Sequence, residues 1–115
     1  MGVNGDSDNM LSVLENFVLS DTDDIAMQIA NDFKQRRIER NLTREQVADK
    51  SGVAISNLAR FEQKGMISLK NLINIATALG YTSELKAIFS VQKYDTMEEL
   101  TQIRRNMGKK RAYRK

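Results

Sequence analysis

The stretch that most constrains the fold of this chain is residues 42–62, LTREQVADKSGVAISNLARFE. Gly52 can adopt the left-handed backbone conformation that ends a helix and turns the chain sharply. Leu58 and Phe61 lie three residues apart on one face of the following helix, so they would pack back onto Val47 of the helix before it. The spacing predicts two short helices joined by a tight turn, with the outward face of the second helix left exposed.

Helical patterns continue on both sides of this stretch. A long first helix is expected to begin near the acids Asp21–Asp24, which suit the positive end of a helix dipole, and to end at Glu39 or Arg40. A capping-box pattern, Thr43 to Gln46, opens the second helix, and Ser68 caps the fourth. The five helices expected in the core cover about residues 21–40, 43–51, 54–63, 69–79 and 83–89.

Apolar periodicity indicates which faces of these helices are buried. The expected buried stripe of the first helix consists of Ile25, Ile29 and Phe33, with Arg36 or Arg37 at its next position, and Ile38 and Leu42 continue the apolar contacts. The fourth helix has a wide apolar face, made of Leu69, Leu72, Ile73, Ile75, Ala76 and Leu79. A further helix is expected over 97–107, opened by a capping box at Thr96–Glu99 and carrying a narrow apolar seam of Leu100, Ile103 and Met107.

The composition excludes several kinds of chemistry. The chain has no cysteine and no histidine, which removes thiol nucleophiles, disulfides, thiolate metal sites and imidazole acid–base catalysis. The acids at 21, 23 and 24 resemble a cation site, but capping of a helix explains them with fewer assumptions. There is no glycine-rich phosphate loop and no nucleophile motif. The sequence therefore predicts no enzyme, no metal site and no cofactor.

A chain of 115 residues is long enough for one compact domain with two extensions. The expected division is an acidic and apolar segment at 1–20, an all-α domain at 21–90, and a C-terminal helix with a basic tail at 91–115. The longest apolar run falls far short of the ~20 residues that span a bilayer, and a cysteine-free chain suits a reducing compartment. We expect a cytoplasmic protein that does not enter a membrane.

The apolar residues at 10–19 lie outside the predicted helical core, so they must cover something else. Periodicity over so few residues does not distinguish a short strand from one or two helical turns. The segment either folds onto its own domain or pairs with a second chain.

Charge is distributed unevenly along the chain. Residues 1–24 carry six acids and no lysine or arginine, whereas the last twelve residues carry no acid. The basic residues of that tail are Arg104, Arg105, Lys109, Lys110, Arg111, Arg114 and Lys115. Such a tail suits the phosphate backbone of DNA or an acidic partner surface, or it simply keeps the chain soluble. Docking to a partner protein is favoured if the Leu100, Ile103 and Met107 seam is exposed.

Two segments, NLTREQVADKSGVAISNLARFEQKG and SLKNLINIATALGY, resemble the XRE or lambda-repressor-like helix-turn-helix family. The resemblance covers about residues 25–90 and implies a five-helix DNA-binding domain. More narrowly, the layout is similar to the HipB-like antitoxins that pair with HipA-type kinase toxins. That likeness rests on Asp23-Asp24-Ile25-Ala26 before the domain and on residues 103–112 after it.

The resemblance implies that the third helix enters the major groove and reads bases. The base-reading positions are Ile55, Ser56 and Arg60, with Asn57 beside them. Arg60 is the side chain best suited to specify a base, through paired hydrogen bonds to guanine O6 and N7. The alternative for Arg60 is a solvated residue that pairs with Glu62 or Asp49.

Contacts to DNA phosphates are expected at the start of the second helix and around the third. The candidates are Thr43, Arg44, Ala54, Lys64 and Lys70. The family often carries glutamine at the position of Arg44, so the resemblance still implies a phosphate contact there but does not extend to a glutamine-mediated bridge to the recognition helix. The resemblance also implies that Glu62 ties its helix to an arginine of the first helix, either Arg36 or Arg37.

Two functions are therefore expected. The first is a homodimeric repressor that binds a two-fold symmetric operator in double-stranded DNA. The second is an antitoxin that binds and neutralises a HipA-like kinase toxin while repressing its own operon.

Overall fold

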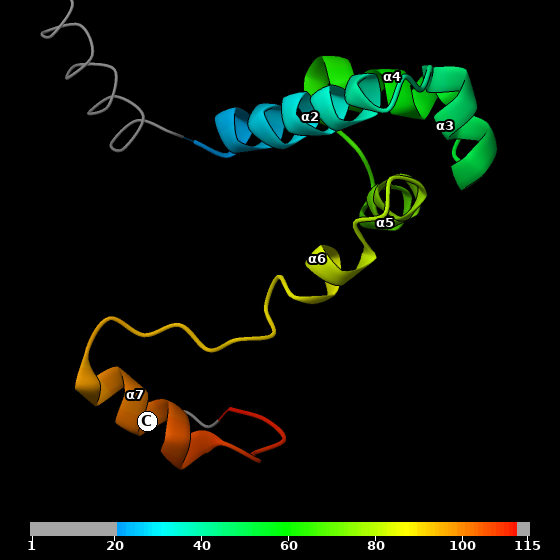
Figure 1. The fold of residues 1–115 in the computed structure, drawn as a ribbon. Helices are drawn as coiled ribbons and strands as arrows, with labels where there is room; N and C mark the ends of the chain where they lie inside the picture. The colour runs from blue at the N-terminus through cyan, green and yellow to red at the C-terminus, as the bar shows by residue number, and fades with distance from the viewer. Residues whose placement is uncertain (1–20, 113–115) are drawn as a thin grey trace, which may run out of the picture. The chain divides into compact units, whose positions relative to one another are not determined.

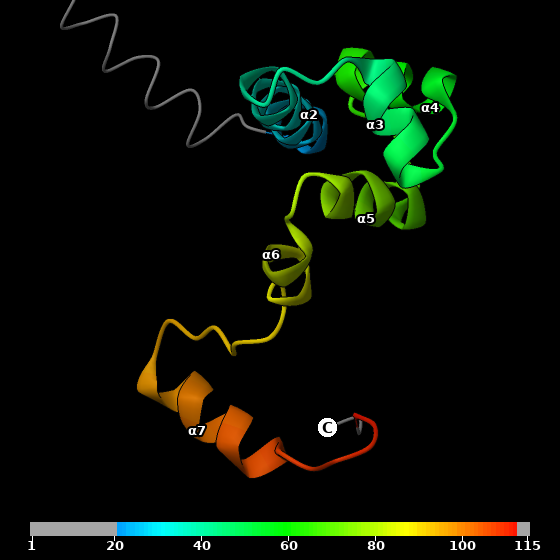
Figure 2. The same ribbon diagram turned by 45° about the vertical axis from the view of Figure 1, so that its right-hand side comes forward.

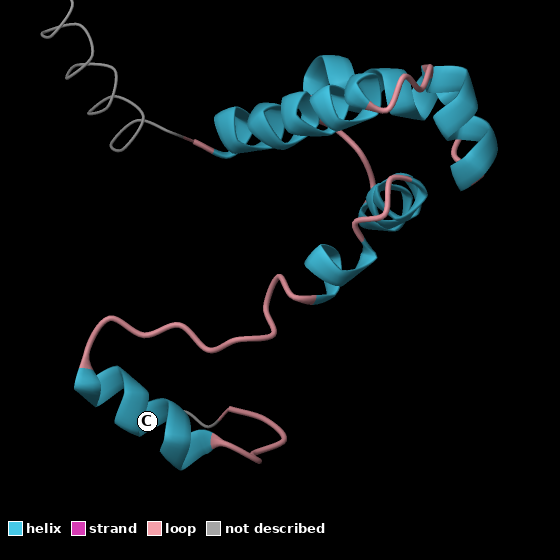
Figure 3. Cartoon of the chain, in the orientation of Figure 1, coloured by secondary structure: helices cyan, strands magenta, loops and turns pink. Residues whose placement is uncertain are grey.

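The computed structural model describes residues 21–112, and these residues are helical wherever they are regular (Figure 1). Their helices are α2 (Thr22–Glu39), α3 (Arg44–Ser51), α4 (Ile55–Lys64), α5 (Leu69–Ala78), α6 (Thr82–Lys86) and α7 (Met97–Asn106). Within 21–112 there is no strand, as Figure 3 shows, which confirms the all-α prediction. The apolar segment expected at 10–19, and Arg114 and Lys115 of the tail, lie outside the described residues.

The chain divides into two compact units, with the boundary between Thr82 and Ser83. Helices α2 to α5 belong to the first unit, and α7 belongs to the second. Helix α6 ends at Lys86, three residues before the expected end at Phe89. The five-helix count and the domain boundaries at residues 21 and 90 stay predictions.

Side chains cap the helices where the sequence places Asp, Ser or Thr. Asp21 accepts a hydrogen bond from the backbone N–H of Asp24 at the start of α2, and Ser68 accepts one at the start of α5. At α3 the capping box is complete: the Gln46 N–H donates to Thr43 Oγ1 at 3.1 Å, and the Thr43 N–H donates to Gln46 Oε1 at 2.8 Å. These bonds satisfy amides that a helix leaves without a partner.

The capping box expected at the start of α7 is only half formed. Thr96 Oγ1 accepts from the Glu99 N–H at 3.1 Å, as predicted. The Glu99 carboxylate, however, accepts from the N–H of Asp95 at 2.9 Å rather than from that of Thr96. The Glu99 side chain thus bonds to the residue before the N-cap threonine and not to the threonine itself. The second of the two capping-box bonds was predicted wrongly.

Left-handed glycines end two of the core helices. Gly52 has φ +74° at the end of α3 and Gly65 has φ +69° at the end of α4. A side chain on Gly65 would also meet the backbone of Ala26, whose carbonyl carbon would lie 3.0 Å from its Cβ. At Gly52, the rest of the described chain, its neighbours in sequence aside, has no atom within 4 Å of the corresponding position. Gly52 is therefore required by its backbone alone, and Gly65 by its backbone and by the close approach of α2.

The hydrophobic core joins α2, α3, α4 and α5, because α2 packs on α4 and α3 packs on both α4 and α5 (Figure 2). The rings of Phe33 and Phe61 meet edge to face with centroids 5.6 Å apart. The buried cluster consists of Ala30, Phe33, Val47, Val53, Leu58, Phe61, Ile75 and Leu79. The predicted packing of Leu58 and Phe61 with Val47 is confirmed.

Helix α2 buries a different face from the one expected. Ile25 and Ile29 are 55% and 47% exposed, and Ile38 is exposed as well. The inward residues are instead Ala26, which lies against Gly65, together with the buried Ala30, Phe33 and Arg37. Helices in such close contact have room for alanine methyl groups and not for isoleucine side chains. The i,i+4 prediction was right for Phe33 and for Arg37 as its next position, and wrong for the isoleucines.

The apolar face of α5 is narrower than predicted. Ile75, Ala76 and Leu79 are buried and Leu72 is partly buried against the core. Leu69 is 68% exposed and Ile73 is also exposed, because the core is closed on only one side of this helix. Two of the six residues expected in the core thus face solvent.

Candidate nucleic-acid interface

Helix α4 separates its structural residues from its exposed residues along two faces. Leu58, Phe61 and Glu62 are buried and face the other helices of the first unit. The opposite side is exposed, and it includes all four predicted base-reading residues: Ile55, Ser56, Asn57 and Arg60. The fold therefore fixes α4 by one face and leaves the other free for a ligand, which is how a recognition helix is presented.

A fifth exposed residue on this side was not predicted from the sequence. Gln63 follows Ser56 by seven residues and Arg60 by three, so these three residues share one stripe of the helix. Glutamine can form paired hydrogen bonds to adenine N6 and N7. The i, i+4, i+7 spacing from Ser56 would have identified it.

Arg60 has no acidic partner among residues 21–112. Its only contact of hydrogen-bonding type there is a weak one, from Nη2 to the Met66 Sδ at 3.6 Å. Neither ion pair named in the alternative is formed within residues 21–112: Glu62 is buried and bound by other arginines, and Arg60 does not pair with Asp49. The guanidinium of Arg60 is thus available to an external acceptor.

Arg60 and Asn57 share a polar hollow of about 340 Å³ beside α4. Its other walls come from the loop after α4 and from the start of α5. The hollow is lined by Asn57, Arg60, Met66, Ile67, Ser68 and Asn71. Two of the predicted base-reading residues therefore lie together around one recess.

A second hollow, of about 620 Å³, lies at the turn between α3 and α4. Glu45 and Asp49 contribute carboxylates to its wall, next to Ile55. The same wall includes Ala54, one of the predicted phosphate contacts.

Glu62 of α4 has a fully buried carboxylate that forms ion pairs with two arginines. Arg37 of α2 donates from Nε to Oε2 at 2.7 Å and from Nη2 to Oε1 at 2.8 Å, which makes a bidentate pair. Arg37 also donates to the Leu42 carbonyl at 2.8 Å. Of the two arginines that the resemblance offered for this role, Arg37 is the partner, while Arg36 pairs with Glu39 on the surface.

Arg44, at the first position of α3, is a second partner of Glu62. Its Nε donates to Glu62 Oε1 at 3.0 Å, and its side chain is 31% exposed. No other hydrogen bond of this guanidinium occurs within residues 21–112. Arg44 was predicted as a phosphate contact, and its link to Glu62 was not predicted because the two residues are 18 positions apart in the sequence.

The two arginines determine the charge state of Glu62. Burial raises the pKa of its carboxyl, but the hydrogen bonds from Arg37 and Arg44 and their positive charges lower it more, so the pKa lies below its ordinary value of 4.5. Glu62 is therefore ionised at neutral pH despite its burial.

The remaining predicted phosphate contacts are exposed. Thr43 and Ala54 are the N-cap residues of α3 and α4, and Lys64 and Lys70 lie on either side of the loop between α4 and α5. Two amides at the start of α3 are occupied by the capping box, whereas no side chain caps α4 at Ala54. An uncapped helix N-terminus favours an anion, so Ala54 is the better placed of the two N-caps.

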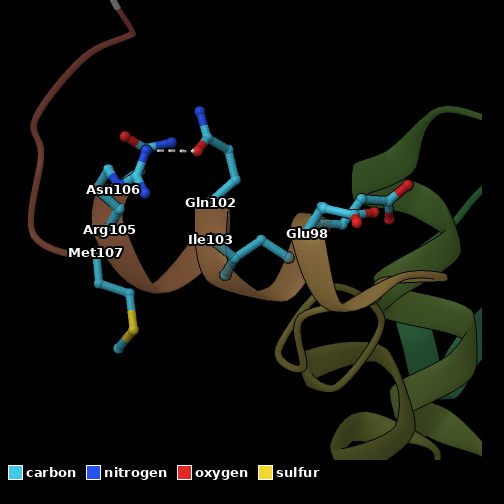
Figure 4. A pocket seen from close by; sticks show the side chains of 7 residues that line it. Glu98, Gln102, Ile103, Arg105, Asn106 and Met107 are labelled. Atoms are coloured by element: carbon cyan, nitrogen blue, oxygen red, sulfur yellow. Dashed lines mark hydrogen bonds between the residues drawn. The ribbon is translucent and has the colours of Figure 1, made fainter.

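The described part of the basic tail belongs to the second unit. Arg104 and Arg105 are in the last turn of α7, and Lys109, Lys110 and Arg111 follow it, all exposed. Figure 4 shows Arg105 on α7, where its Nη1 donates to Gln102 Oε1 at 3.2 Å.

Residues 21–112 hold no group of acidic side chains that would bind a metal ion. None of the helices in this part of the chain is both long and apolar enough to cross a membrane.

Comparison with known proteins relates the central part of the chain to a family. Residues 33–85 match the helix-turn-helix family. The match, of XRE type, spans just under half of the chain and includes α3, the turn at Gly52 and α4. Proteins of this helix-turn-helix type bind DNA, which supports a DNA-binding regulator. No curated protein matches the chain significantly.

Proposed function

We propose that this protein is a sequence-specific transcriptional repressor that inserts α4 into the major groove of operator DNA. The observation that carries the proposal is the state of Arg60. It is exposed on the outward face of a helix anchored by Leu58 and Phe61, and it lacks an acidic partner within the described residues. A guanidinium in that position can form paired hydrogen bonds to guanine.

Each residue of the interface has a role in this proposal. Arg60, Asn57 and Ser56 bond to base edges, and Ile55 contacts a thymine methyl group. The phosphates on either side are bound by Arg44 and Lys64, with further contacts from Thr43, Ala54 and Lys70. Phosphate contacts set the register of the helix, and base contacts set the sequence.

We further propose that two copies bind one operator as a homodimer. A recognition helix as short as α4 covers only a few base pairs, so a second copy supplies the additional contacts that a genomic site requires. The two half-sites would then lie about one helical turn, roughly 34 Å, apart.

The experiment is binding to the protein's own promoter DNA and to a scrambled duplex, titrated against salt. Arg60→Ala should lower affinity for the promoter by about 5- to 150-fold, the equivalent of 1–3 kcal/mol, and change the scrambled duplex little. Arg36→Ala is the matched control, because Arg36 is an exposed arginine paired with Glu39 on α2. Equal losses for the two variants, or equal binding of both duplexes by the wild type, would contradict base reading by Arg60.

The second unit favours a second candidate function, that of an antitoxin. It leaves large apolar side chains uncovered, with Phe89 95% exposed and Val91, Met97 and Met107 exposed as well. Of the three residues of the predicted seam, Met107, just after α7, is exposed, and Leu100 and Ile103 are half-buried. Exposed apolar residues of this number suit a protein partner.

The partner in this second proposal is a HipA-like kinase toxin encoded by a neighbouring gene. Arg60→Ala should then weaken operator binding by the factor given above and leave neutralisation of the toxin intact. Loss of both activities together would argue against two separate surfaces.

A further inference from the structure

The buried carboxylate of Glu62 binds two arginines that differ in exposure. Arg37, which is itself buried, donates a hydrogen bond to each of the two carboxylate oxygens of Glu62. That pair links α4 to α2 without any contribution from Arg44, beside the ring contact of Phe33 with Phe61. Arg44 adds a third hydrogen bond, from the partly exposed side of the same carboxylate.

The bond from Arg44 uses only its Nε. Both Nη groups of this guanidinium lack a hydrogen-bond partner among residues 21–112, and the side chain is at the first position of α3, where a phosphate contact is expected. An arginine in solution loses the freedom of several rotatable bonds when it binds a phosphate. A guanidinium already fixed through Nε has lost part of that freedom before DNA arrives.

We propose that Glu62 is a positioning residue that holds Arg44 in the orientation from which its Nη groups bind a DNA phosphate. This inference rests on the proposed DNA-binding function. It assigns to Glu62 a role beyond its attachment of α4 to α2. The residue that anchors the recognition helix also orients the arginine that binds a phosphate of the DNA backbone. The two sets of contacts, to bases and to phosphate, are thereby fixed relative to one another by one carboxylate.

The test is a double-mutant cycle on DNA affinity, with Glu62→Gln, Arg44→Ala and the combined variant. Affinity for the promoter duplex is measured by fluorescence anisotropy, at a temperature at which circular dichroism shows each variant folded. With Arg44 present, Glu62→Gln should weaken binding on the order of 3- to 30-fold. In the Arg44→Ala background it should change affinity by less than about twofold.

A merely structural role for Glu62 predicts the opposite pattern. Glu62→Gln would then weaken binding by the same factor in both backgrounds, and that result would overturn the proposal. Arg37→Lys is the matched control, because it disturbs the buried pair without altering Arg44. An equal loss of affinity in Arg37→Lys and Glu62→Gln would also overturn it.

A second measurement needs no variant at position 62. The Nε–H signal of Arg44 in the NMR spectrum of the wild-type protein should be resolved and protected from exchange, and it should remain so in the DNA complex. Its loss on binding would mean that Arg44 leaves Glu62 to reach the phosphate, which overturns positioning. A wild-type protein that binds neither duplex would refute the proposed function itself, whereas an additive cycle refutes only the role of Glu62.

Discussion

Arg37 and Glu62 form a bidentate ion pair inside the first unit, with Nε to Oε2 at 2.7 Å and Nη2 to Oε1 at 2.8 Å. The two residues are 25 positions apart and join α2 to α4. A buried carboxylate is unfavourable without such a partner, so loss of Arg37 would leave the Glu62 charge poorly compensated between α2 and α4.

Removal of Arg37 should destabilise the protein more than removal of Arg44. Arg37→Met leaves a buried carboxylate with one exposed partner, and we expect the free energy of unfolding to fall by about 3–5 kcal/mol. Arg44→Met removes one hydrogen bond at a partly exposed site and should cost about 1 kcal/mol. Urea denaturation measures both, and equal losses would contradict the central place of the Arg37 pair.

Acid should destabilise the protein through Glu62. Its pKa is lower in the folded chain than in the unfolded chain, so its contribution to stability is full above its ordinary pKa of 4.5 and is lost as the pH falls through the lower folded value. Thermal unfolding of the wild type and of Glu62→Gln, followed from pH 7 to pH 3, measures this. The difference between the two proteins should shrink below about pH 4.5, and a constant difference would exclude Glu62 as the source.

The two glycines that end α3 and α4 should differ in their tolerance of a methyl group. Gly52→Ala meets open space and suffers only the strain of a left-handed backbone, about 1–2 kcal/mol. Gly65→Ala suffers the same strain and also presses on the Ala26 backbone, which should add at least about 1 kcal/mol. Chemical denaturation of the two variants should rank Gly65→Ala as the less stable.

The two faces of α4 should respond differently to truncation. Leu58→Ala empties a fully buried site and should cost about 2–5 kcal/mol of stability. Ile55→Ala removes an exposed side chain, so stability should change by less than about 0.5 kcal/mol while operator affinity falls. Denaturation and DNA binding should be measured on the same samples, since a large loss of stability in Ile55→Ala would place that residue in the core instead.

The lysines at the proposed interface should contribute to the salt dependence of DNA binding. Lys70→Ala should reduce the slope of log K against log salt concentration by about 0.9, the loss of one phosphate contact. Lys86→Ala is the control, since Lys86 is exposed in the second unit. Equal changes in the two slopes would show that Lys70 acts only through net charge.

The amino-acid sequence by itself determined the features that depend on near neighbours. Gly52 and Gly65 end their helices, Thr43 and Gln46 cap one another, and Leu58 lies on the buried face of its helix. These features follow from backbone conformation and helical spacing, which act over four residues or fewer. The exposure of the four predicted residues on α4 was predictable for the same reason.

Only the tertiary structure decided which distant residues meet. The isoleucines of α2 were expected inside, but Ala26 and Ala30 lie there, because the space between α2 and its neighbours is set by Gly65 and Phe61 rather than by hydrophobicity along α2. The link from Arg44 to Glu62 has the same origin, since the crossing of α3 and α4 brings together side chains that no local pattern relates. Local periodicity specifies a helix and its possible faces, and packing selects the face that is buried.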